Sequence, residues 1–326
     1  MVAKVATTVP RSTESYSLGQ MTDPTVKTPS TEATPRPVRV AFQGERGAYS
    51  EEAVHRLCPQ STPVPYPQFD RVFDALISGA VDMAVIPIEN SLFGSIHVNY
   101  DLLRTHDVRI TGQHHLRIKH HLMTRPGVSL ADVKQVFSHP QALGQCAVYL
   151  KNQLPHAEAE AFYDTAGAAM MVATSERMDI AAIASAQAAA QYGLEIHAGG
   201  IETNHANYTR FLRLHRPPDA ESMATDFAGP SSLQGRMITS IVYALAQNIP
   251  GSLYKSLAAS ALREVDLLKI ESRPLVGKPG EYLFYLDLAG TMEDAPIQRA
   301  IDHLHEMTTE FKWIGSYPAT SPSAED

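Results

Sequence analysis

The feature that most constrains the fold is an alternation of short apolar runs with helix-like segments, which begins at residue 38. The run at 83–88 is apolar throughout and the run at 38–44 is apolar at Val38 and at 40–42, which is typical of buried strands. Between them, residues 69–79 carry apolar side chains three and four positions apart, which indicates an amphipathic helix. The alternation continues to residue 193. It predicts α/β units with mainly parallel strand pairing, in which ligands bind at the carboxyl ends of strands.

Composition excludes several classes of protein. The chain has 326 residues, 44% of them hydrophobic, which is enough for two or three compact units. Its net charge of -8 disfavours non-specific binding to nucleic acid. No apolar run approaches the ~18 residues that span a bilayer, so we expect neither a nucleic-acid nor a membrane partner. The two cysteines, Cys58 and Cys146, lack CxxC spacing, which predicts a reducing cytosol and no structural zinc.

Residues 1–37 differ from the rest of the chain in being rich in Ser, Thr and Pro. They offer little apolar surface, so we expect a disordered tail. No apolar core of a secretory signal follows the first residues. An organellar transit peptide is the alternative, although Glu14, Asp23 and Glu32 argue against it. We therefore expect a cytoplasmic protein and leave import by the tail open.

The pattern changes after the α/β region at 38–215. Residues 216–236 are rich in Pro, Gly, Ser and charges, which predicts a linker. Residues 237–318 then read as strand, helix, strand, strand, helix, strand. This βαββαβ order is that of a ferredoxin-like unit. We expect residues 319–326 to form a flexible end.

Two polar motifs follow predicted strands. Glu89, Asn90 and Ser91 come directly after the run at 83–88, and polar residues at a strand's carboxyl end indicate a site. The motif GERGAYSEE at 44–52 follows a strand and opens a helix, whose free N–H groups suit an anion or carboxylate. The alternative for the second motif is a glycine turn with Ser50 as a cap.

A third motif, SHPQALGQC, places Ser138 and His139 after another strand and begins a helix at Pro140. Gln141 and Gln145 are four residues apart and share one face of that helix. A Ser–His pair suggests a hydrolase. We reject that interpretation because adjacent strand residues point to opposite faces and the chain has no G-x-S-x-G turn.

Two more motifs stand where an element begins. DTAGAA at 164–169 opens a helix, with Asp164 or Thr165 as the N-cap. NHANYTRF at 204–211 leads into a short strand that starts near Thr209 and Arg210.

Residues 113–121 hold four of the fourteen histidines and suggest a metal site. Strand alternation places His115, Arg117, Lys119 and His121 on one face and His114, Leu116, Ile118 and His120 on the other. The two cations on the first face oppose metal binding. We therefore expect a solvated or interdomain strand and no metal.

Taken together, the motifs resemble those of the prephenate dehydratase family over residues 38–318. The segments that carry the resemblance are GERGAYSE, IENSLFGSI, SHPQALGQC, DTAGAA and NYTRF, with PGSL, KIESRP and GSYP in the C-terminal unit. The resemblance implies a catalytic unit of two α/β lobes with a cleft, like periplasmic binding proteins, at 38–215. It further implies a C-terminal ACT regulatory domain at 237–318, no cofactor, and no mutase activity because the N-terminal region is only a polar tail.

The resemblance also implies roles for residues. The family gives the threonine that matches Thr209 a central catalytic role. The catalytic set carried over is Thr209, Arg210, Glu89, Asn90, Ser138 and Gln145. Ser50, Ser91, Gln141, Thr165 and Phe211 are the expected substrate contacts. Allosteric phenylalanine binding is expected at Asn248, Gly251, Ser252, Leu253, Glu271, Ser272, Arg273 and Pro274, where Ser252 replaces the commoner Ala.

The chemistry of this family constrains those roles. The substrate, prephenate, loses carbon dioxide and hydroxide and becomes aromatic. A hydroxyl such as Thr209 can donate to the departing oxygen but is a weak acid, so a protonated Glu89 or water is the ultimate proton donor. We expect Arg210 to hold the pyruvyl end of the substrate; the alternative is that it pairs with a protein carboxylate and orients Thr209.

Two rival functions remain. An arogenate dehydratase performs the same chemistry on an amine in place of the ketone. A non-catalytic amino-acid sensor would share the two-lobed fold but would not need the Thr209 and Asn90 motifs. The expected effector is L-phenylalanine, and the expected assembly is a homodimer or homotetramer.

Overall fold

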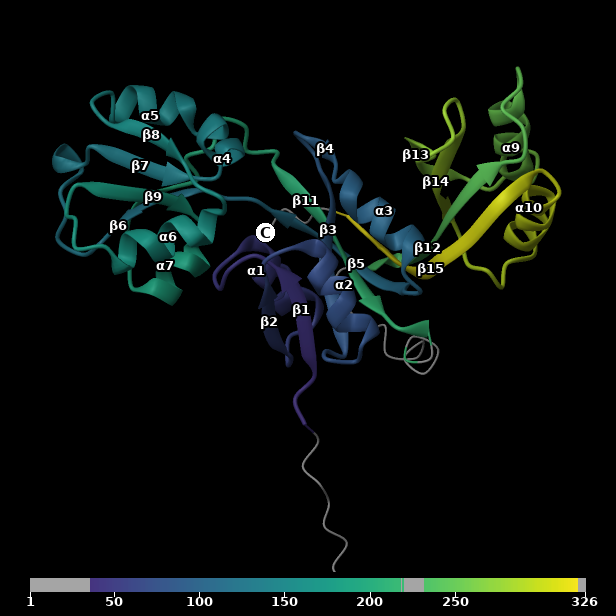
Figure 1. Cartoon of the computed structure of the whole chain (residues 1–326), viewed down its shortest axis with the longest axis horizontal. Helices are drawn as coiled ribbons and strands as arrows, with labels where there is room; N and C mark the ends of the chain where they lie inside the picture. The colour runs from purple at the N-terminus through teal and green to yellow at the C-terminus, as the bar shows by residue number, and fades with distance from the viewer. Residues whose placement is uncertain (1–35, 218, 220–231, 322–326) are drawn as a thin grey trace, which may run out of the picture. The chain divides into compact units, whose positions relative to one another are not determined.

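We describe the fold from a computed structural model, which covers residues 36–217, 219 and 232–321. Most of the predicted tail and linker lies outside these residues. The described chain forms three sheets, each with its own helices (Figure 1). We call the first two lobe 1 and lobe 2, and the third the C-terminal unit. No described helix is long and apolar enough to cross a membrane.

Lobe 1 has the strand order β2-β1-β3-β11-β5, with the short β4 paired to β3. Its strands are β1 (Arg39–Gln43), β2 (Thr62–Tyr66), β3 (Met83–Asn90), β4 (Gly94–Ser95), β5 (Arg109–Arg117) and β11 (Tyr208–His215). Its helices are α1 (Tyr49–Leu57), α2 (Phe69–Ile77) and α3 (His97–Thr105). Because β11 returns from lobe 2, it pairs antiparallel with both β3 and β5.

Lobe 2 has the strand order β10-β6-β9-β7-β8. Its strands are β6 (His121–Thr124), β7 (Gln135–Ser138), β8 (Glu158–Ala161), β9 (Ile180–Ala184) and β10 (Glu195–Gly199). Its helices are η1 (Leu130–Asp132), α4 (Pro140–Gln145), α5 (Ala147–Gln153), α6 (Thr165–Thr174) and α7 (Ala186–Tyr192). The run after Pro140, which we expected to form one helix, is broken at Cys146 into α4 and α5.

The two lobes correct our expectation of mainly parallel pairing. β1 pairs parallel with β2 and β3, and β7 pairs parallel with β8 and β9. The other pairings in both lobes are antiparallel. The physical reason is that the chain crosses between the lobes twice, and the strand that follows each crossing, β6 or β11, runs opposite to its neighbours in the sheet.

The C-terminal unit has the predicted βαββαβ order and the antiparallel strand order β13-β14-β12-β15. Its elements are β12 (Ser232–Leu245), α9 (Ser252–Ala261), β13 (Leu267–Pro274), β14 (Tyr282–Ala289), α10 (Ala295–His305) and β15 (Thr308–Thr320). Strand β12 begins at Ser232, inside the segment that we expected to be a linker, and β15 continues to Thr320, past the expected end at 318.

Shared cores join the three parts. One buried cluster combines Phe42 and Val85 of lobe 1 with Ala166 and Ala182 of lobe 2. A second combines Ile86, Tyr100 and Leu214 of lobe 1 with Val242 and Tyr317 of the C-terminal unit. The backbones also approach closely, since a Cβ on Gly315 of β15 would clash with the carbonyl of Ile110 in β5. The C-terminal sheet therefore packs directly on lobe 1.

Candidate functional site

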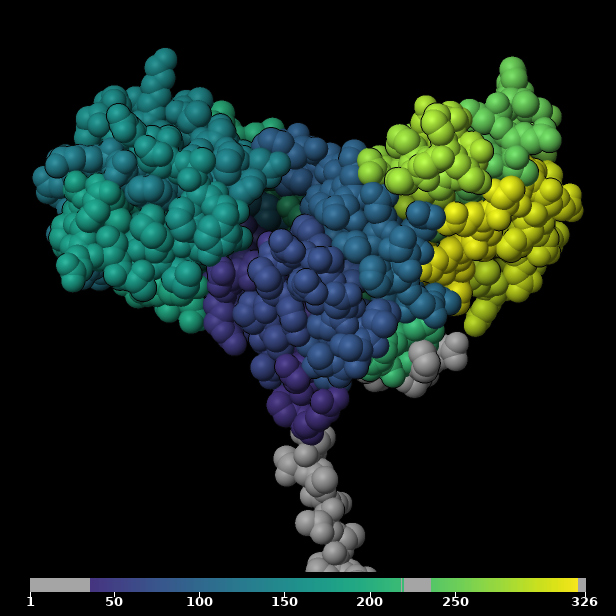
Figure 2. Space-filling view, viewed as in Figure 1, coloured from purple at the N-terminus to yellow at the C-terminus, as the bar shows by residue number. Residues whose placement is uncertain are grey.

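The candidate site lies where the chain crosses between lobe 1 and lobe 2. One crossing runs from the end of β5 through residues 118–120 to β6, and the other runs from β10 through residues 200–207 to β11. The first crossing contains the histidine-rich segment: residues 113–117 end β5, residues 118–120 lie outside any strand, and His121 begins β6. In the space-filling view a recess opens between the teal surface of lobe 2 and the blue surface of lobe 1 (Figure 2).

Thr209 and Asn90 face each other at this crossing. They are register partners on the adjacent strands β11 and β3. Asn90 Nδ2 donates to Thr209 Oγ1 at 3.0 Å, and Thr209 is only 8% exposed. A hydroxyl carries one proton and accepts through its lone pairs. Asn90 uses an acceptor position, and no described residue receives the Thr209 proton, so the Thr209 hydroxyl remains a donor for a ligand.

The backbone fixes the orientation of the Asn90 amide. Its Oδ1 accepts from the backbone N–H of Leu92 at 2.9 Å and of Phe93 at 3.1 Å. Because those groups can only donate, Nδ2 must be the donor side. Nδ2 then donates to Asn207 Oδ1 at 2.8 Å as well as to Thr209. Asn90 therefore has no free polar atom, and it orients Thr209.

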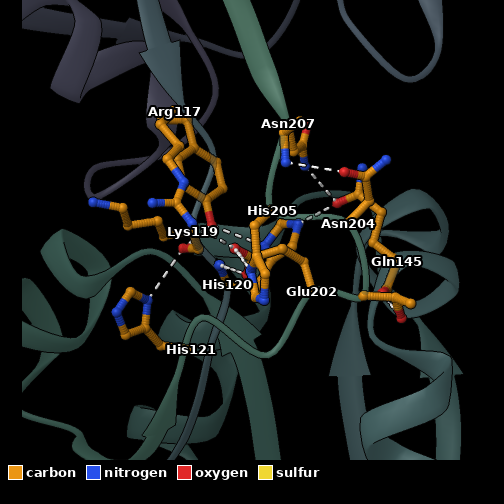
Figure 3. Close-up of polar contacts among 12 residues, drawn as sticks. Arg117, Lys119, His120, His121, Gln145, Glu202, Asn204, His205 and Asn207 are labelled. Carbon is orange, nitrogen blue, oxygen red and sulfur yellow. Dashed lines mark hydrogen bonds and ion pairs between the residues drawn. The ribbon is translucent and has the colours of Figure 1, made fainter. Parts of the chain in front are cut away.

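Gln145 joins this set from lobe 2. Its Oε1 accepts from Asn207 Nδ2 at 3.1 Å, and the same oxygen lies 2.5 Å from His120 Nε2 (Figure 3). His120 Nδ1 lies 2.8 Å from the Tyr49 hydroxyl of α1. Burial lowers the pKa of His120 and raises that of Tyr49, so both groups tend to be neutral. The bonds link α1, both crossings and α4.

Glu202 anchors the second crossing beneath His120. Its side chain is fully buried, and Oε2 accepts from the His120 backbone N–H at 2.9 Å. Its Oε1 lies 3.9 Å from Arg117 Nη2 and 3.4 Å from His205 Nδ1. Figure 3 shows these side chains converging on the crossing. A buried carboxylate held by several donors ties the two crossings together.

Glu89 and Arg210 occupy the opposite face of the same two strands. They are also register partners, but alternation turns them away from Thr209 and Asn90. Arg210 Nη1 lies 2.8 Å from Asp287 Oδ2 of β14, and Lys269 Nζ of β13 lies 2.8 Å from Glu89 Oε2. The Arg210 geometry agrees with our alternative, pairing with a protein carboxylate. Glu89 is not beside the Thr209 hydroxyl, where a proton donor to the leaving group would have to be.

Arg210 is held by a buried polar group of the C-terminal unit. Its Nη2 donates to the Tyr317 hydroxyl at 2.9 Å, and its Nε donates to Gln113 at 2.7 Å. Ser240 completes the group by donating to Asp287 at 2.5 Å. Burial opposes the charge of Arg210, but Tyr317 and Asp287 raise its pKa. Arg210 therefore stays charged and ties β11 to the C-terminal sheet.

The other predicted catalytic and substrate residues are dispersed. Ser138 is fully buried and donates to the Ile183 carbonyl at 2.6 Å, so its proton is used within lobe 2. Phe211 is 2% exposed and packs in the shared core. Ser91 is exposed and donates to the Ala206 carbonyl. Gln141 is exposed at the start of α4.

Ser50 and Thr165 lie in the first turns of α1 and α6. Helix α1 starts after Ala48, which provides no side-chain cap. The preceding loop packs against lobe 2, where Ser185 donates to the Gly47 carbonyl at 2.6 Å. Gly47 has φ +84°, and a Cβ there would lie 2.6 Å from the Ala188 Cα, so this close approach requires glycine.

The predicted effector residues fall in two places. Gly251, with φ +86°, precedes α9, and Leu253 is 37% exposed, so this turn is open to solvent. Ser252 Oγ accepts from the Ile249 N–H, and Asn248 donates to the Gly280 carbonyl. The other predicted effector residues lie at the end of β13; they are Glu271, Ser272, Arg273 and Pro274.

Two of these β13 residues contact lobe 1. Glu271 accepts from Ser95 at 2.5 Å and lies 3.2 Å from His97 Nε2. Arg273 Nη2 lies 2.9 Å from Asp101 Oδ2. Within one chain, therefore, β13 contributes polar contacts to lobe 1.

Sequence reasoning missed His120, Asn207, Glu202, Lys269 and Asp287. A signal for His120 was present, because alternation placed it on the face of Leu116 and Ile118, which are 1% and 6% exposed. Nothing local marks Lys269 or Asp287. Within the described ranges, no group of three His, Cys, Asp or Glu side chains could hold a metal ion.

Comparison with known proteins identifies a family. A family model for prephenate dehydratase matches residues 40–219. The chain is 45% identical to arogenate dehydratase/prephenate dehydratase 2, chloroplastic, of Arabidopsis thaliana, over 86% of this chain and 73% of the relative. It is 43% identical to arogenate dehydratase 2 of Petunia hybrida, over 87% of this chain and 72% of the relative.

Solved structures agree with this match. A prephenate dehydratase from Arthrobacter aurescens, in complex with L-Phe, aligns with a TM-score of 0.76 and 29% identity, over 87% of this chain and 93% of that one. A structure described as GqqA, a novel type of quorum quenching acylase, aligns with a TM-score of 0.75 and 33% identity. The alignment covers 87% of this chain and 98% of that one.

Proposed function

The chain belongs to the prephenate dehydratase family, and from this premise we propose that it converts arogenate to phenylalanine, with prephenate as a second substrate. Our sequence-based expectation put prephenate first. The names of the plant relatives at 45% and 43% identity favour arogenate, and one of them includes both substrates. Both reactions remove carbon dioxide and hydroxide from a cyclohexadiene ring, so the same catalytic groups serve either.

The orientation of the Thr209 hydroxyl is the observation that most supports the proposed reaction. Asn90 donates to Thr209 Oγ1, and the Thr209 proton has no acceptor among the described residues. The departing hydroxide develops negative charge, so a preoriented donor stabilises the transition state more than the ground state. A threonine hydroxyl is a weak acid, and we assign it this hydrogen bond while water supplies the proton.

The substrate carboxylates need their own donors. The first turn of α1 has free backbone N–H groups beside Ser50, and the loop before α1 contacts lobe 2. At α6, the Asp164 carboxylate already accepts from the Gly167 N–H at 2.9 Å, so this turn is occupied. We assign the side-chain carboxylate of the substrate to the first turn of α1. We no longer assign it to Arg210, because that guanidinium is bonded to Asp287, Tyr317 and Gln113.

We also propose control by L-phenylalanine through the C-terminal unit. The turn at Gly251 and Leu253 is exposed and opens α9, which suits the carboxylate of an amino acid. The ion pairs Arg210–Asp287 and Glu89–Lys269 connect the C-terminal sheet to β11 and β3. Any shift of that sheet on binding therefore acts on the two strands that hold Thr209 and Asn90.

Assembly and compartment follow from two observations. Strand β13 is an edge strand, and Leu268 and Ile270 on it are 45% and 42% exposed. This edge supports pairing of two chains, so we propose a homodimer or homotetramer. Cys58 and Cys146 are both buried and free, which supports a reducing, cytosolic compartment.

Acylase activity, which is named for the GqqA structure, is a second candidate. It would need a nucleophile activated by an adjacent base. The Thr209 hydroxyl has the Asn90 amide beside it, and an amide is not a base at neutral pH. We therefore do not assign this activity.

Product analysis tests the proposal. The purified chain is incubated separately with arogenate and with prephenate, and phenylalanine or phenylpyruvate is quantified. We expect turnover of both and a higher kcat/KM for arogenate. Turnover of prephenate alone would overturn the substrate order, and turnover of neither would overturn the reaction.

A further inference from the structure

His120 is the one residue whose ring joins lobe 1 to lobe 2 by two hydrogen bonds of the network around Thr209. Nδ1 faces Tyr49 of α1 at 2.8 Å, and Nε2 faces Gln145 of α4 at 2.5 Å (Figure 3). His120 is 3% exposed, and its ring packs edge-on against Tyr49 with centroids 5.6 Å apart.

The proton positions in this network follow from the backbone. Leu92 and Phe93 donate to Asn90 Oδ1, which makes Asn90 Nδ2 the donor to Asn207 Oδ1. Asn207 Nδ2 is then the donor to Gln145 Oε1. A carbonyl oxygen only accepts, so His120 Nε2 must carry a proton to bond the same atom.

Two bonds on Gln145 Oε1 have a consequence for its nitrogen. The amide is planar, so holding Oε1 against His120 and Asn207 fixes the direction of both N–H groups on Nε2. No described residue accepts from that Nε2. The Gln145 amide is thus a preoriented double donor, which suits a carboxylate or carbonyl oxygen.

We propose that His120 is a positioning residue, which holds the Gln145 amide so that its two N–H groups bind an oxygen of the substrate. This inference rests on the proposed function for the identity of the substrate. The bond to Gln145 Oε1 requires a proton on Nε2 in both forms of the ring. In the neutral form the Tyr49 hydroxyl donates to Nδ1, and in the charged form Nδ1 donates to Tyr49, which donates to the Lys119 carbonyl. His120 therefore acts through its geometry, and its ionisation takes no part in the reaction.

The groups around His120 fit this role. The titratable or charged side chains near it are Tyr49, His121, Cys146, Glu202 and, through Glu202, Arg117. None of them reaches Nε2, whose bonding partner is Gln145. A transfer of the Nε2 proton toward Thr209 would have to pass through three amides, which are poor proton carriers. Proton supply by this route is excluded on chemical grounds.

Two substitutions of His120 distinguish the hydrogen bond at Nε2 from the one at Nδ1. The Gln amide nitrogen falls near the position of the histidine Nε2, whereas the Asn amide falls near that of Nδ1. His120→Gln therefore keeps a donor to Gln145, and His120→Asn loses it. We expect kcat/KM to fall roughly tenfold in His120→Asn, the effect of one buried hydrogen bond, and by less than about threefold in His120→Gln.

A pH profile distinguishes positioning from acid–base catalysis. We expect the pH dependence of kcat/KM in His120→Gln to parallel that of the parent. Equal losses in both variants, or loss of one limb of the profile in His120→Gln, would overturn the proposal in favour of a proton-transfer role. An unchanged kcat/KM in His120→Asn would overturn it as well.

A stability measurement keeps the inference separate from the proposed function. Urea unfolding of His120→Asn, Gln145→Leu and the double variant gives the coupling between the two side chains. We expect the double variant to be no less stable than the worse single variant. Additive losses would contradict the bond. A parent that turns over neither substrate would refute the proposed function while this cycle still tests the His120–Gln145 contact.

Discussion

The guanidinium of Arg210 in β11 lies 2.8 Å from the carboxylate of Asp287 in β14, with side chains only 11% and 13% exposed. Arg210 is the neighbour of Thr209, and its register partner Glu89 is the neighbour of Asn90. Each of the two strands thus turns one polar residue toward the lobe crossing and the next toward the C-terminal sheet. In this chain the two motifs therefore contact both the lobe crossing and the C-terminal sheet.

Removing the Asp287 charge should destabilise the fold. Asp287→Asn leaves the buried Arg210 without its carboxylate, which we expect to cost about 3 kcal/mol. Lys269→Met should cost less than about 1 kcal/mol, because its partner Glu89 is 36% exposed. Urea unfolding measures both, with Asp302→Asn on the exposed face of α10 as the matched control. A loss at Asp287 no larger than at Asp302 would show that the pair does not hold the domains together.

Lys269→Met should also weaken the response to phenylalanine. Its ion pair with Glu89 is one of two described ion pairs from the C-terminal sheet to β3 and β11. We expect kcat without effector to stay within about twofold, since Lys269 does not contact the Thr209 network. The measurement is kcat/KM with and without saturating phenylalanine. An unaltered ratio would mean that control does not pass through this pair.

The turn before α9 should bind phenylalanine. Gly251→Val adds bulk at an exposed turn, and its φ of +86° disfavours any side chain there. We expect calorimetric titration to show loss of binding, with basal kcat retained because the turn lies outside both lobes. The melting temperature serves as the control, since only local strain is introduced. Binding of phenylalanine by the variant with parental affinity would refute this site.

Stability should fall on acidification because of buried histidines. Burial lowers the pKa of His115 and of His215 to about 4. The unfolded chain, with a histidine pKa near ~6.5, binds more protons between those values. Stability is therefore lost as the pH falls from about 6.5 to 4, by up to roughly 3 kcal/mol per histidine.

His215→Asn tests this pH dependence. It preserves an amide near Nδ1, which faces Thr111 Oγ1 at 2.7 Å, but it cannot be protonated. The difference in melting temperature between pH 7 and pH 4.5 should shrink relative to the parent. Exposed His156→Asn should leave that difference unchanged. A pH dependence in His215→Asn identical to the parent's would show that the acid sensitivity has another origin.

The sequence predicted where the helices and strands lie better than it predicted which part of the molecule each face of a strand contacts. The alternation of apolar runs located β3, the segment NHANYTRF located β11, and the βαββαβ order of the C-terminal unit is confirmed. It did not predict that β11 presents Thr209 and Arg210 to different domains, because both faces of this strand are covered. A strand with one solvated face shows its orientation in its polarity, and β11 has no such face.

The contacts that complete the site are distant in sequence. Lys269 is 180 residues from Glu89, and Asp287 is 77 from Arg210. No local pattern reports such pairs. His120 could have been found, because it continues the apolar face of Leu116 and Ile118. The four histidines of the segment directed attention to a metal site, and the cations on the other face argued against one.

The central claim is that the Thr209 hydroxyl, oriented by Asn90, donates to the departing oxygen, and one comparison of kcat tests it. Thr209→Val keeps the shape and removes the hydroxyl, whereas Thr209→Ser keeps the hydroxyl. We expect kcat to fall on the order of 10² to 10³ in Thr209→Val, with KM little changed, and by less than about tenfold in Thr209→Ser. A Thr209→Val variant with near-parental kcat would contradict the account.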